Sequence, residues 1–245
     1  MLKFFRKIRQ KLLSENKFSK YLIYAIGEIV LVVIGILIAL SINNWNENRK
    51  NNNELSKILI FVKNDLKADT LGLKIPLEAY KKTNLNIQKI LDKEIPKSYF
   101  DTINKVNFEK CEFCSHQSVA YNHIFIQDKG IELLKKFTST SSDTLISNIL
   151  SFHNVYKEFF NDDNNQIKNL GRENAALLEK YNWYPEFRAN KYNSDYISYI
   201  SESNEYQNKI ATYKVFSTTA VMDLEDYKKK AIKYIKILEE NYPEK

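Results

Sequence analysis

The stretch that decides the fold is LIYAIGEIVLVVIGILIALSI, residues 22–42. Fourteen of its 21 residues are Leu, Ile or Val, and residues 29–40 are twelve consecutive apolar or glycine positions. At about 1.5 Å per residue, a helix of this length extends roughly 30 Å, the thickness of the hydrocarbon core of a bilayer. The aliphatic side chains favour insertion by roughly 4–8 kcal/mol, whereas one acidic residue, here Glu28, costs at most about 2.5–3.5 kcal/mol. The sequence therefore predicts a transmembrane helix over residues 21–43.

A cleaved signal peptide is the alternative for this segment. The apolar core of a signal peptide has about 7–15 residues and is followed by a cleavage site of small residues. The core in this chain is longer, but Ala39-Leu40-Ser41 has the composition of a cleavage tripeptide. We expect a retained signal-anchor, with cleavage as the open alternative.

The basic residues are concentrated before the span. The chain carries a net charge of +7, and residues 1–20 contribute seven Lys or Arg and one Glu, so the other 225 residues hold only +1. A nucleic-acid-binding domain carries its positive charge on the folded body, so this class is excluded. Arg49 and Lys50 are the only basic residues close after the span. The positive-inside rule predicts a cytoplasmic flank over residues 1–20 and places the domain of residues 44–245 on the opposite side of the membrane.

The flank itself has an amphipathic pattern. Leu2, Phe5, Ile8 and Leu12 share one helical face of MLKFFRKIRQKLL, residues 1–13, and basic residues fill most of the rest. A short helix of this kind lies on an anionic leaflet. A disordered basic flank is the alternative.

Glu28 belongs to a stripe of small residues on the span. Steps of three and four from Glu28 reach Tyr21, Ala25, Val32, Gly35, Ala39 and Ile42. Small residues let transmembrane helices approach closely, and Gly35-x-x-x-Ala39 is a small-xxx-small pair. We interpret Ala25, Glu28, Val32, Gly35 and Ala39 as an association face for a second copy of the chain or another membrane protein. Alternatively, a protonated Glu28 forms a hydrogen bond within its own helix.

Two stretches carry a family resemblance. KFFRKIRQKLLSENKFSKYLIYAIGEIVLVVIGILIALSINNWNE, residues 3–47, resembles the opening of a domain-of-unknown-function family of single-pass membrane proteins from Gram-negative bacteria. SVAYNHIFIQDKGIELLKKF, residues 118–137, resembles the second recurring block of that family, a Ser-x-x-Tyr start followed by a Gly and an aliphatic run. The resemblance implies a single-pass protein of the bacterial inner membrane with a periplasmic domain over residues 44–245, and it implies no catalytic residue.

Helical periodicity predicts an all-α bundle after the span. Glycine (5) and proline (4) are scarce, which favours long helices. We expect the span helix to continue through Leu55–Leu66 and the chain to break at Pro76. Helices are expected over 77–93, 119–137, 145–160, 167–181 and the last 25 or so residues, with irregular segments at 95–117 and 182–195. The apolar positions expected in the core are Leu55, Ile58, Leu59, Val62, Leu66, Leu85, Ile87, Ile90, Leu91, Val119, Ile126, Leu133, Phe137, Leu145, Ile149, Phe152, Tyr156, Phe159, Ile167, Leu170, Leu177, Tyr181, Val221, Leu224, Ala231, Ile235 and Leu238. TSTSSDT, residues 138–144, is expected as a linker that ends in helix N-cap residues.

The segment CEFCSHQSVAYNH, residues 111–123, concentrates both cysteines and two of the three histidines. Cys111, Cys114, His116 and His123 are the residue types that zinc prefers, but their spacing is unusual for a zinc site. A haem-attachment motif requires His directly after the second Cys, where this chain has Ser115. We expect a structural pair, either a local disulfide or two packed thiols, and no bound cofactor.

Two further segments have an open interpretation. Trp183, Tyr184, Phe187 and Arg188 belong to an aromatic stretch that either caps one end of the bundle or forms a recognition surface for a ligand or partner. NDDNN, residues 161–165, lacks the Gly and the terminal Glu of a calcium loop, and we expect a solvated turn there.

Three hypotheses of function follow. The first is a non-enzymatic, membrane-anchored interaction or scaffold protein whose partners are the lipid bilayer and either its own copies or another membrane protein. The second is a periplasmic ligand sensor that signals through a membrane partner. The third is a metal or redox protein built around Cys111 and Cys114.

Overall fold

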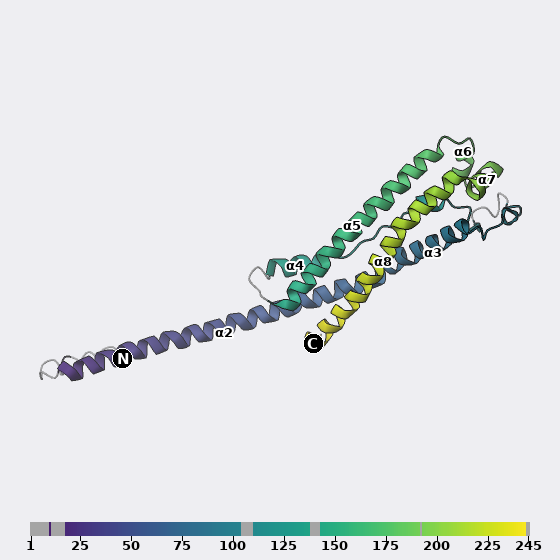
Figure 1. The fold of residues 1–245 in the computed structure, drawn as a ribbon. Coiled ribbons are helices and arrows are strands. Elements are labelled where there is room, and N and C mark those ends of the chain that lie inside the picture. The colour runs from purple at the N-terminus through teal and green to yellow at the C-terminus, as the bar shows by residue number, and fades with distance from the viewer. Residues whose placement is uncertain (1–9, 11–17, 104–109, 138–142, 192, 244–245) are drawn as a thin grey trace. The chain divides into compact units, whose positions relative to one another are not determined.

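A computed structural model describes residues 10, 18–103, 110–137, 143–191 and 193–243. The described residues are mostly helical and contain no strand, which confirms the all-α prediction (Figure 1). The elements in order are α2 (Phe18–Gly72), α3 (Lys74–Leu91), the 3₁₀ turns η1 (Lys97–Phe100) and η3 (Gln117–Val119), α4 (Lys129–Phe137), α5 (Thr144–Leu178), α6 (Tyr184–Arg188), α7 (Ser194–Glu202) and α8 (Asn204–Asn241). The amphipathic face expected on residues 2–12 lies outside the described residues.

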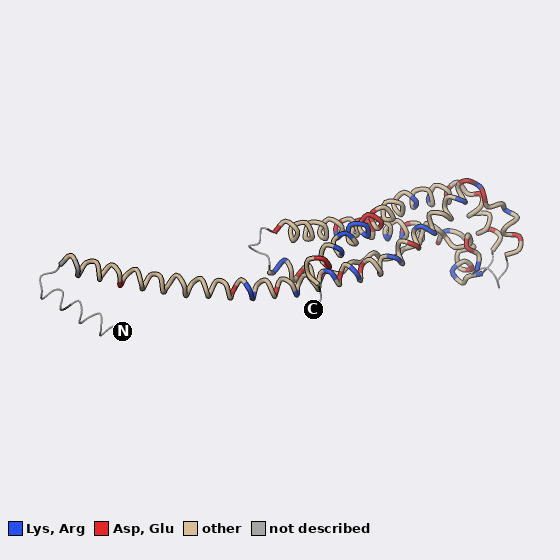
Figure 2. The backbone as a smooth tube through the Cα atoms, turned by 90° about the horizontal axis from the view of Figure 1, so that it is seen from below, with Lys and Arg blue, Asp and Glu red and all other residues tan. Residues whose placement is uncertain are grey.

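The chain divides into an N-terminal unit, Met1–Lys57, and a C-terminal unit, Ile58–Lys245. In the N-terminal unit, residues 18–57 are the first part of α2, and the predicted span, 22–42, lies inside this helix. Its large apolar side chains, from Leu22 at 50 % exposure to Ile42 at 61 %, are all open to the surroundings. Figure 2 shows the same stretch as a long tan section almost free of charge. Among the described helices, this is one that is long and apolar enough to cross a membrane.

The C-terminal unit is a helical bundle organised around α8, a helix of 38 residues. α3 and α5 both pack against α8, and α6 and α7 lie at the end of the unit where α5 ends and α8 begins (Figure 1). The predicted stripe on the second part of α2 is confirmed, because Leu59 and Val62 are fully buried. The N-cap prediction also holds, since the Asp143 carboxylate accepts the N–H of Leu145 at 2.8 Å and begins α5.

Tyrosine supplies much of the core. Tyr80, Tyr196, Tyr206, Tyr213 and Tyr227 are all fully buried, and they are the largest side chains with no exposed surface. A buried tyrosine contributes a large apolar ring but must place its hydroxyl against a polar partner. The sequence-based core contained none of these five residues.

The break between the first two helices of the bundle is earlier than expected. α2 ends at Gly72 and α3 begins at Lys74, so Pro76 lies in the first turn of α3. The N–H groups of the first turn have no partner within the helix, so proline costs little there. The predicted break at Pro76 was therefore wrong by about one turn.

The helix predicted over 119–137 is half as long as expected. Only Lys129–Phe137 forms α4, whereas residues 120–128 form neither helix nor strand. Ile124 and Ile126 are 2 % and 5 % exposed and Phe125 between them is 57 % exposed, an alternation typical of an extended chain. The apolar residues in this stretch fit the helical period of about 3.6 residues as well as the extended period of 2. Contacts with distant residues select the extended conformation.

The two helical stretches predicted over 145–160 and 167–181 are both helical, but they form one continuous helix, α5. NDDNN, residues 161–165, lies inside α5 and is not a turn, with Asp163 and Asn164 buried. Three residues expected in the core are exposed at 44–55 %: Leu85, Phe159 and Leu177. Each lies one or two positions from a buried residue, at the edge of a stripe whose other members, such as Ile87, Ile149 and Ile167, are buried as predicted.

Candidate functional site

The predicted association face lies on one side of the N-terminal part of α2. Val32, Gly35 and Ala39 are exposed, while Ala25 and Glu28 are partly exposed. A Cβ atom added at Gly35 would meet no atom of another described segment within 4 Å. The contact with a second helix stays a prediction.

In the C-terminal unit, the central feature is the segment of residues 118–128, which lies among the helices and forms no ladder of its own. Its backbone is bonded by side chains. Asn164 Oδ1 accepts the N–H of Ile124 at 2.9 Å, and Asn164 Nδ2 donates to the Ile124 carbonyl at 2.7 Å. Tyr80 Oη does the same at Asn122, donating to the carbonyl at 2.7 Å and accepting from the N–H at 3.0 Å.

Further bonds to this segment come from three more helical positions. Tyr213 Oη donates to the Ala120 carbonyl at 2.6 Å, Asn174 Nδ2 donates to Ser118 O at 3.1 Å, and Asp69 Oδ1 accepts the Gln127 N–H at 2.8 Å. Buried backbone groups require partners, and an irregular segment finds them only if side chains supply them. The 118–128 segment is thus held in place by α2, α3, α5 and α8.

Sequence reasoning missed these anchoring residues. A usable signal existed in α5, where Asn164 and Asn174 are in phase with buried Ile167 and Leu178. A polar residue on the apolar face of a helix requires a buried partner. The pattern would have predicted the need for a partner, although not its identity.

Where the segment meets α4, two backbones approach closely. Gly130 N–H donates to Asp65 Oδ2 at 2.6 Å, and a Cβ atom at Gly130 would lie 2.8 Å from the backbone N and Cα of Val62. Contacts this short are not found for real Cβ atoms, so only glycine permits the packing of α4 on α2.

Two buried carboxyl groups titrate at unusually high pH. Burial raises the pKa of Asp69 to about 6, despite hydrogen bonds from Tyr227 Oη at 2.6 Å and from the Gln127 N–H, which lower it. Burial and the nearby Asp223 and Asp162 raise the pKa of Asp163 to about 7. We interpret both groups as determinants of stability.

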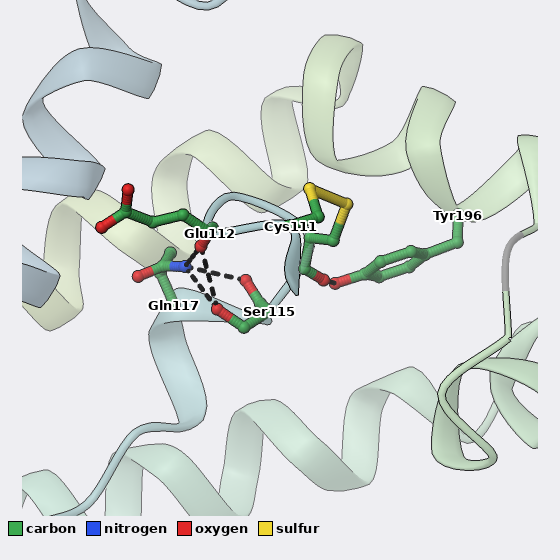
Figure 3. The surroundings of a disulfide bond; sticks show 6 residues. Cys111, Glu112, Ser115, Gln117 and Tyr196 are labelled. Atoms are coloured by element: carbon green, nitrogen blue, oxygen red, sulfur yellow. Dashed lines mark hydrogen bonds between the residues drawn. A yellow bond between two sulfur atoms is a disulfide. The ribbon is translucent and has the colours of Figure 1, made fainter. Parts of the chain in front are cut away.

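Cys111 and Cys114 form a disulfide within a tight turn, with their Cα atoms 5.2 Å apart (Figure 3). Tyr196 Oη, shown pointing at the turn, donates to the Cys114 carbonyl at 2.7 Å. Gln117 Nε2 donates to Ser115 O at 2.9 Å and also approaches Ser115 Oγ and Glu112 O. The sequence left a disulfide and packed thiols open, and the structure has the disulfide.

The two histidines of the zinc alternative lie in different surroundings. His116 is 3 % exposed, bonds to Ser118 Oγ through Nδ1 at 2.9 Å, and borders the same cavity as the disulfide. His123 is exposed, with Tyr121 Oη 2.9 Å from its Nδ1, and borders a different cavity with Lys157. In the described part of the chain, no group of three or more His, Cys, Asp or Glu side chains is placed to hold a metal ion.

The aromatic stretch near residue 183 packs into a cluster at one end of the bundle. Trp183 is 5 % exposed and its ring lies 4.8 Å from those of Tyr181 and Tyr196, while Phe187 lies 4.6 Å from Tyr196. Tyr184 is partly exposed and Arg188 is exposed. The arrangement suits the end-cap interpretation, and recognition by the exposed members stays a prediction.

One comparison with known proteins found a match. The family of unknown function DUF6090 matches residues 28–161, more than half of the chain. The chain belongs to this family. Neither the comparison with curated proteins nor the comparison with solved structures found a match.

The DUF6090 match includes most of the span and the whole second block of the sequence resemblance, residues 118–137. It therefore covers the 118–128 segment, the disulfide turn and Gly130. It ends at residue 161, before Asn164, Asn174, Tyr213 and Tyr227. In this DUF6090 protein, the 118–128 segment thus lies inside the matched region, while many of the side chains that form hydrogen bonds with it lie outside.

Proposed function

We propose that the chain is a single-pass protein of the bacterial inner membrane, with its N-terminus in the cytoplasm and residues 44–245 in the periplasm. The observation that carries this proposal is the exposure of the apolar span: side chains such as Leu31 (67 %) and Ile34 (50 %) are not covered by other residues that the structure describes. Lipid is the surrounding in which so much exposed aliphatic surface is favourable. The seven basic residues before the span support the orientation. The disulfide supports an oxidising compartment for the C-terminal unit.

A reporter fusion tests the topology. A reporter that is active only outside the cytoplasm, fused after Lys245, is expected to be active. Mass spectrometry of the mature chain is expected to find residues 1–42 retained. Activity of a cytoplasm-only reporter at the same position would contradict the orientation, and a mature N-terminus near Ile42 would mean that the span is cleaved.

We further propose that the protein acts by association and not by catalysis, with the face of Ala25, Glu28, Val32, Gly35 and Ala39 as a contact to a second transmembrane helix. The pair Gly35-x-x-x-Ala39 supports this, because small residues four positions apart let a second helix approach closely. A carboxylate at the same face can form a hydrogen bond across the contact.

Crosslinking of tagged chains in membranes tests the association. Gly35→Leu and Ala39→Leu add apolar bulk, so insertion is unharmed while association weakens. Val33→Leu and Ile36→Leu, off the face, are the matched controls and are expected to be neutral. Glu28→Gln is expected to be milder than Glu28→Leu by about 0.5–1 kcal/mol, the size of an interhelical hydrogen bond in lipid.

Equal crosslinking for Gly35→Leu, Glu28→Leu and the two controls would mean that the face contacts lipid alone. The assay is run between copies of the chain and against any membrane protein that co-purifies, so that self-association and association with a partner are distinguished.

A ligand sensor is the second candidate, and a cavity beside the disulfide favours it. A sensor would pass its signal to a membrane partner through the same helix face. A ligand that raises the melting temperature and alters crosslinking at Gly35 would select the sensor over a plain scaffold.

A further inference from the structure

Helix α8 carries a second stripe of mainly apolar residues on the side that faces away from the core. Ala211, Val215, Thr218 and Met222 follow one another in steps of four, three and four residues. Side chains at this spacing form the seam between two paired helices. Val215 and Met222 are each 64 % exposed, and Thr218 is exposed as well. No residue that the structure describes covers these three side chains.

Helix α3 widens this surface, because it runs beside α8 in the opposite direction (Figure 1). Lys81 forms an ion pair with Glu225, and Asn84 Nδ2 donates to Thr218 Oγ1 at 3.3 Å. Leu85 follows Asn84 in α3 and is 55 % exposed, so it lies beside the stripe. We call the set of Leu85, Ala211, Val215, Thr218 and Met222 the outer face.

The outer face contains a groove as well as exposed side chains. The residues that border this groove come from the end of α3 and from α8: Leu91, Ala211, Lys214, Val215, Thr218 and Thr219. Met222 lies one helical turn beyond Thr218, next to the groove. Single exposed apolar side chains are common on protein surfaces, whereas a group of them beside a groove marks an interaction surface. A two-fold contact requires a surface that is complementary to itself, and a groove flanked by apolar side chains can meet this requirement.

Most charged residues around the outer face already have a partner in the same chain. These contacts are the ion pairs Lys81–Glu225, Lys82–Glu112 and Lys74–Glu78, and the hydrogen bond from Lys214 Nζ to Gln88 Oε1. A strongly acidic or basic partner would find little opposite charge here. Two identical surfaces of this kind do not repel each other, so the charges favour a second copy of the chain.

The outer face is small, and this also bears on the identity of its partner. A specific interface buries about 800 Å² on each partner, and five residues within about three helical turns cover less than this. The contact is therefore weak between free molecules. Two chains anchored in one membrane meet at a high effective concentration, which makes a weak contact sufficient. This step rests on the membrane anchor proposed above.

We propose that the outer face is the contact between the C-terminal units of two copies of this chain. Val215 and Met222 of each copy pack against the outer face of the other, and Leu85 flanks the contact. The inference goes beyond the contact proposed for the span, because it uses a different surface in a different unit.

Cysteine crosslinking of the full-length chain in bacterial membranes tests the inference. Thr218 lies within the outer face between Val215 and Met222, so Thr218→Cys lies near its own copy whichever way the two helices run. The native cysteines are joined in a disulfide and do not react with a short bis-maleimide. Thr218→Cys is expected to give a product of two chains at a yield at least about tenfold above that of Asn165→Cys, an exposed position on α5.

Charged substitutions in the Thr218→Cys chain locate the contact. Met222→Asp and Val215→Lys each place a charge without a partner in it, and each is expected to lower the yield about tenfold. Both side chains are exposed, so the helical fold is expected to persist, which circular dichroism checks. Thr212→Asp is the matched control, because Thr212 is exposed on the same helix but lies outside the outer face. It should leave the yield unchanged.

The inference is overturned if Thr218→Cys crosslinks no better than Asn165→Cys, or if the product contains another protein in place of a second copy. It is equally overturned if Met222→Asp and Val215→Lys both crosslink like Thr212→Asp. Gly35→Leu in the Thr218→Cys chain separates this inference from the span contact. Loss of the product with Met222→Asp but not with Gly35→Leu contradicts the span contact alone, and the reverse pattern contradicts the outer face alone.

Discussion

Asn164→Ala removes the side chain that holds the middle of the 118–128 segment. In the structure, the Asn164 amide satisfies both the N–H and the carbonyl of Ile124, at 2.9 and 2.7 Å, in a place where Asn164 is 7 % and Ile124 2 % exposed. Alanine leaves both backbone groups buried without partners. Each such group costs about 1–3 kcal/mol, and the higher helix propensity of alanine returns only about 0.6 kcal/mol. We expect a net loss of about 2–5 kcal/mol.

The measurement is thermal and urea unfolding of the full chain in detergent, followed by circular dichroism at a helical wavelength. For a unit of this size, 1 kcal/mol shifts Tm by about 2–4 °C, so the expected fall is at least about 5 °C. Asn165→Ala is the matched control, because Asn165 is the same residue type, one position along the same helix, and exposed. It should be neutral or slightly stabilising.

Asn164→Asp separates the contributions of the two hydrogen bonds to Ile124. A carboxylate can still accept the Ile124 N–H, but it cannot donate to the carbonyl, which it then faces with a negative charge. Asn164→Asp should therefore also be destabilising, and more so as the pH rises and the carboxyl ionises. If Asn164→Ala and Asn165→Ala unfold within about 1 °C of each other, the amide does not anchor the segment and the reasoning fails.

Three more predictions follow from the same unit. Gly130→Ala is expected to cost about 1–3 kcal/mol, because its Cβ meets the α2 backbone, whereas Gly72→Ala, with open space around it, should not destabilise; equal melting temperatures would contradict the close approach. The pKa of Asp163 is about 7 in the folded state and about 4 in the unfolded state, so the wild type should lose about 1–3 kcal/mol of stability as the pH rises from 5 to 8. Asp163→Asn, which cannot ionise, should not show this loss. Parallel profiles of stability against pH for the two proteins would refute the prediction. Cys111→Ser with Cys114→Ser should leave a folded helical chain without stoichiometric zinc and cost about 2 kcal/mol, as expected for a short closed loop; a metal analysis and a melt check both statements.

The parts of the fold that the sequence predicts well are those set by local periodicity. The span needs only the composition of residues 22–42. The stripe at Leu59 and Val62 needs only a spacing of three to four, and both side chains are fully buried. Such patterns predict burial reliably because an apolar helix face is covered in the folded protein, either by lipid or by a neighbouring helix.

The parts that sequence reasoning misses depend on contacts between distant residues. Val119 and Ile126 suit a helix as well as an extended chain, and the decision comes from Asn164 and Tyr80, about 40 residues away in opposite directions. Tyr213 and Tyr227 were not expected in the core because their burial requires hydroxyl partners on the 118–128 segment and α2. The disulfide was one of two open alternatives, because two cysteines at this spacing do not by themselves determine the turn conformation that the disulfide needs.

The bonds between α8 and the earliest part of the C-terminal unit bear on the order of events during synthesis. Tyr227 reaches Asp69 across 158 residues, and Tyr213 reaches Ala120 across 93. These contacts cannot form until α8 has been synthesised. Until then, the apolar faces of α2, α3 and α5 that pack against α8 stay exposed. A nascent chain stalled before residue 204 would hold Asp69 and the 118–128 segment without those partners. Completion of the core is thus deferred until α8 has been synthesised, and any factor that protects the growing chain has to act until then.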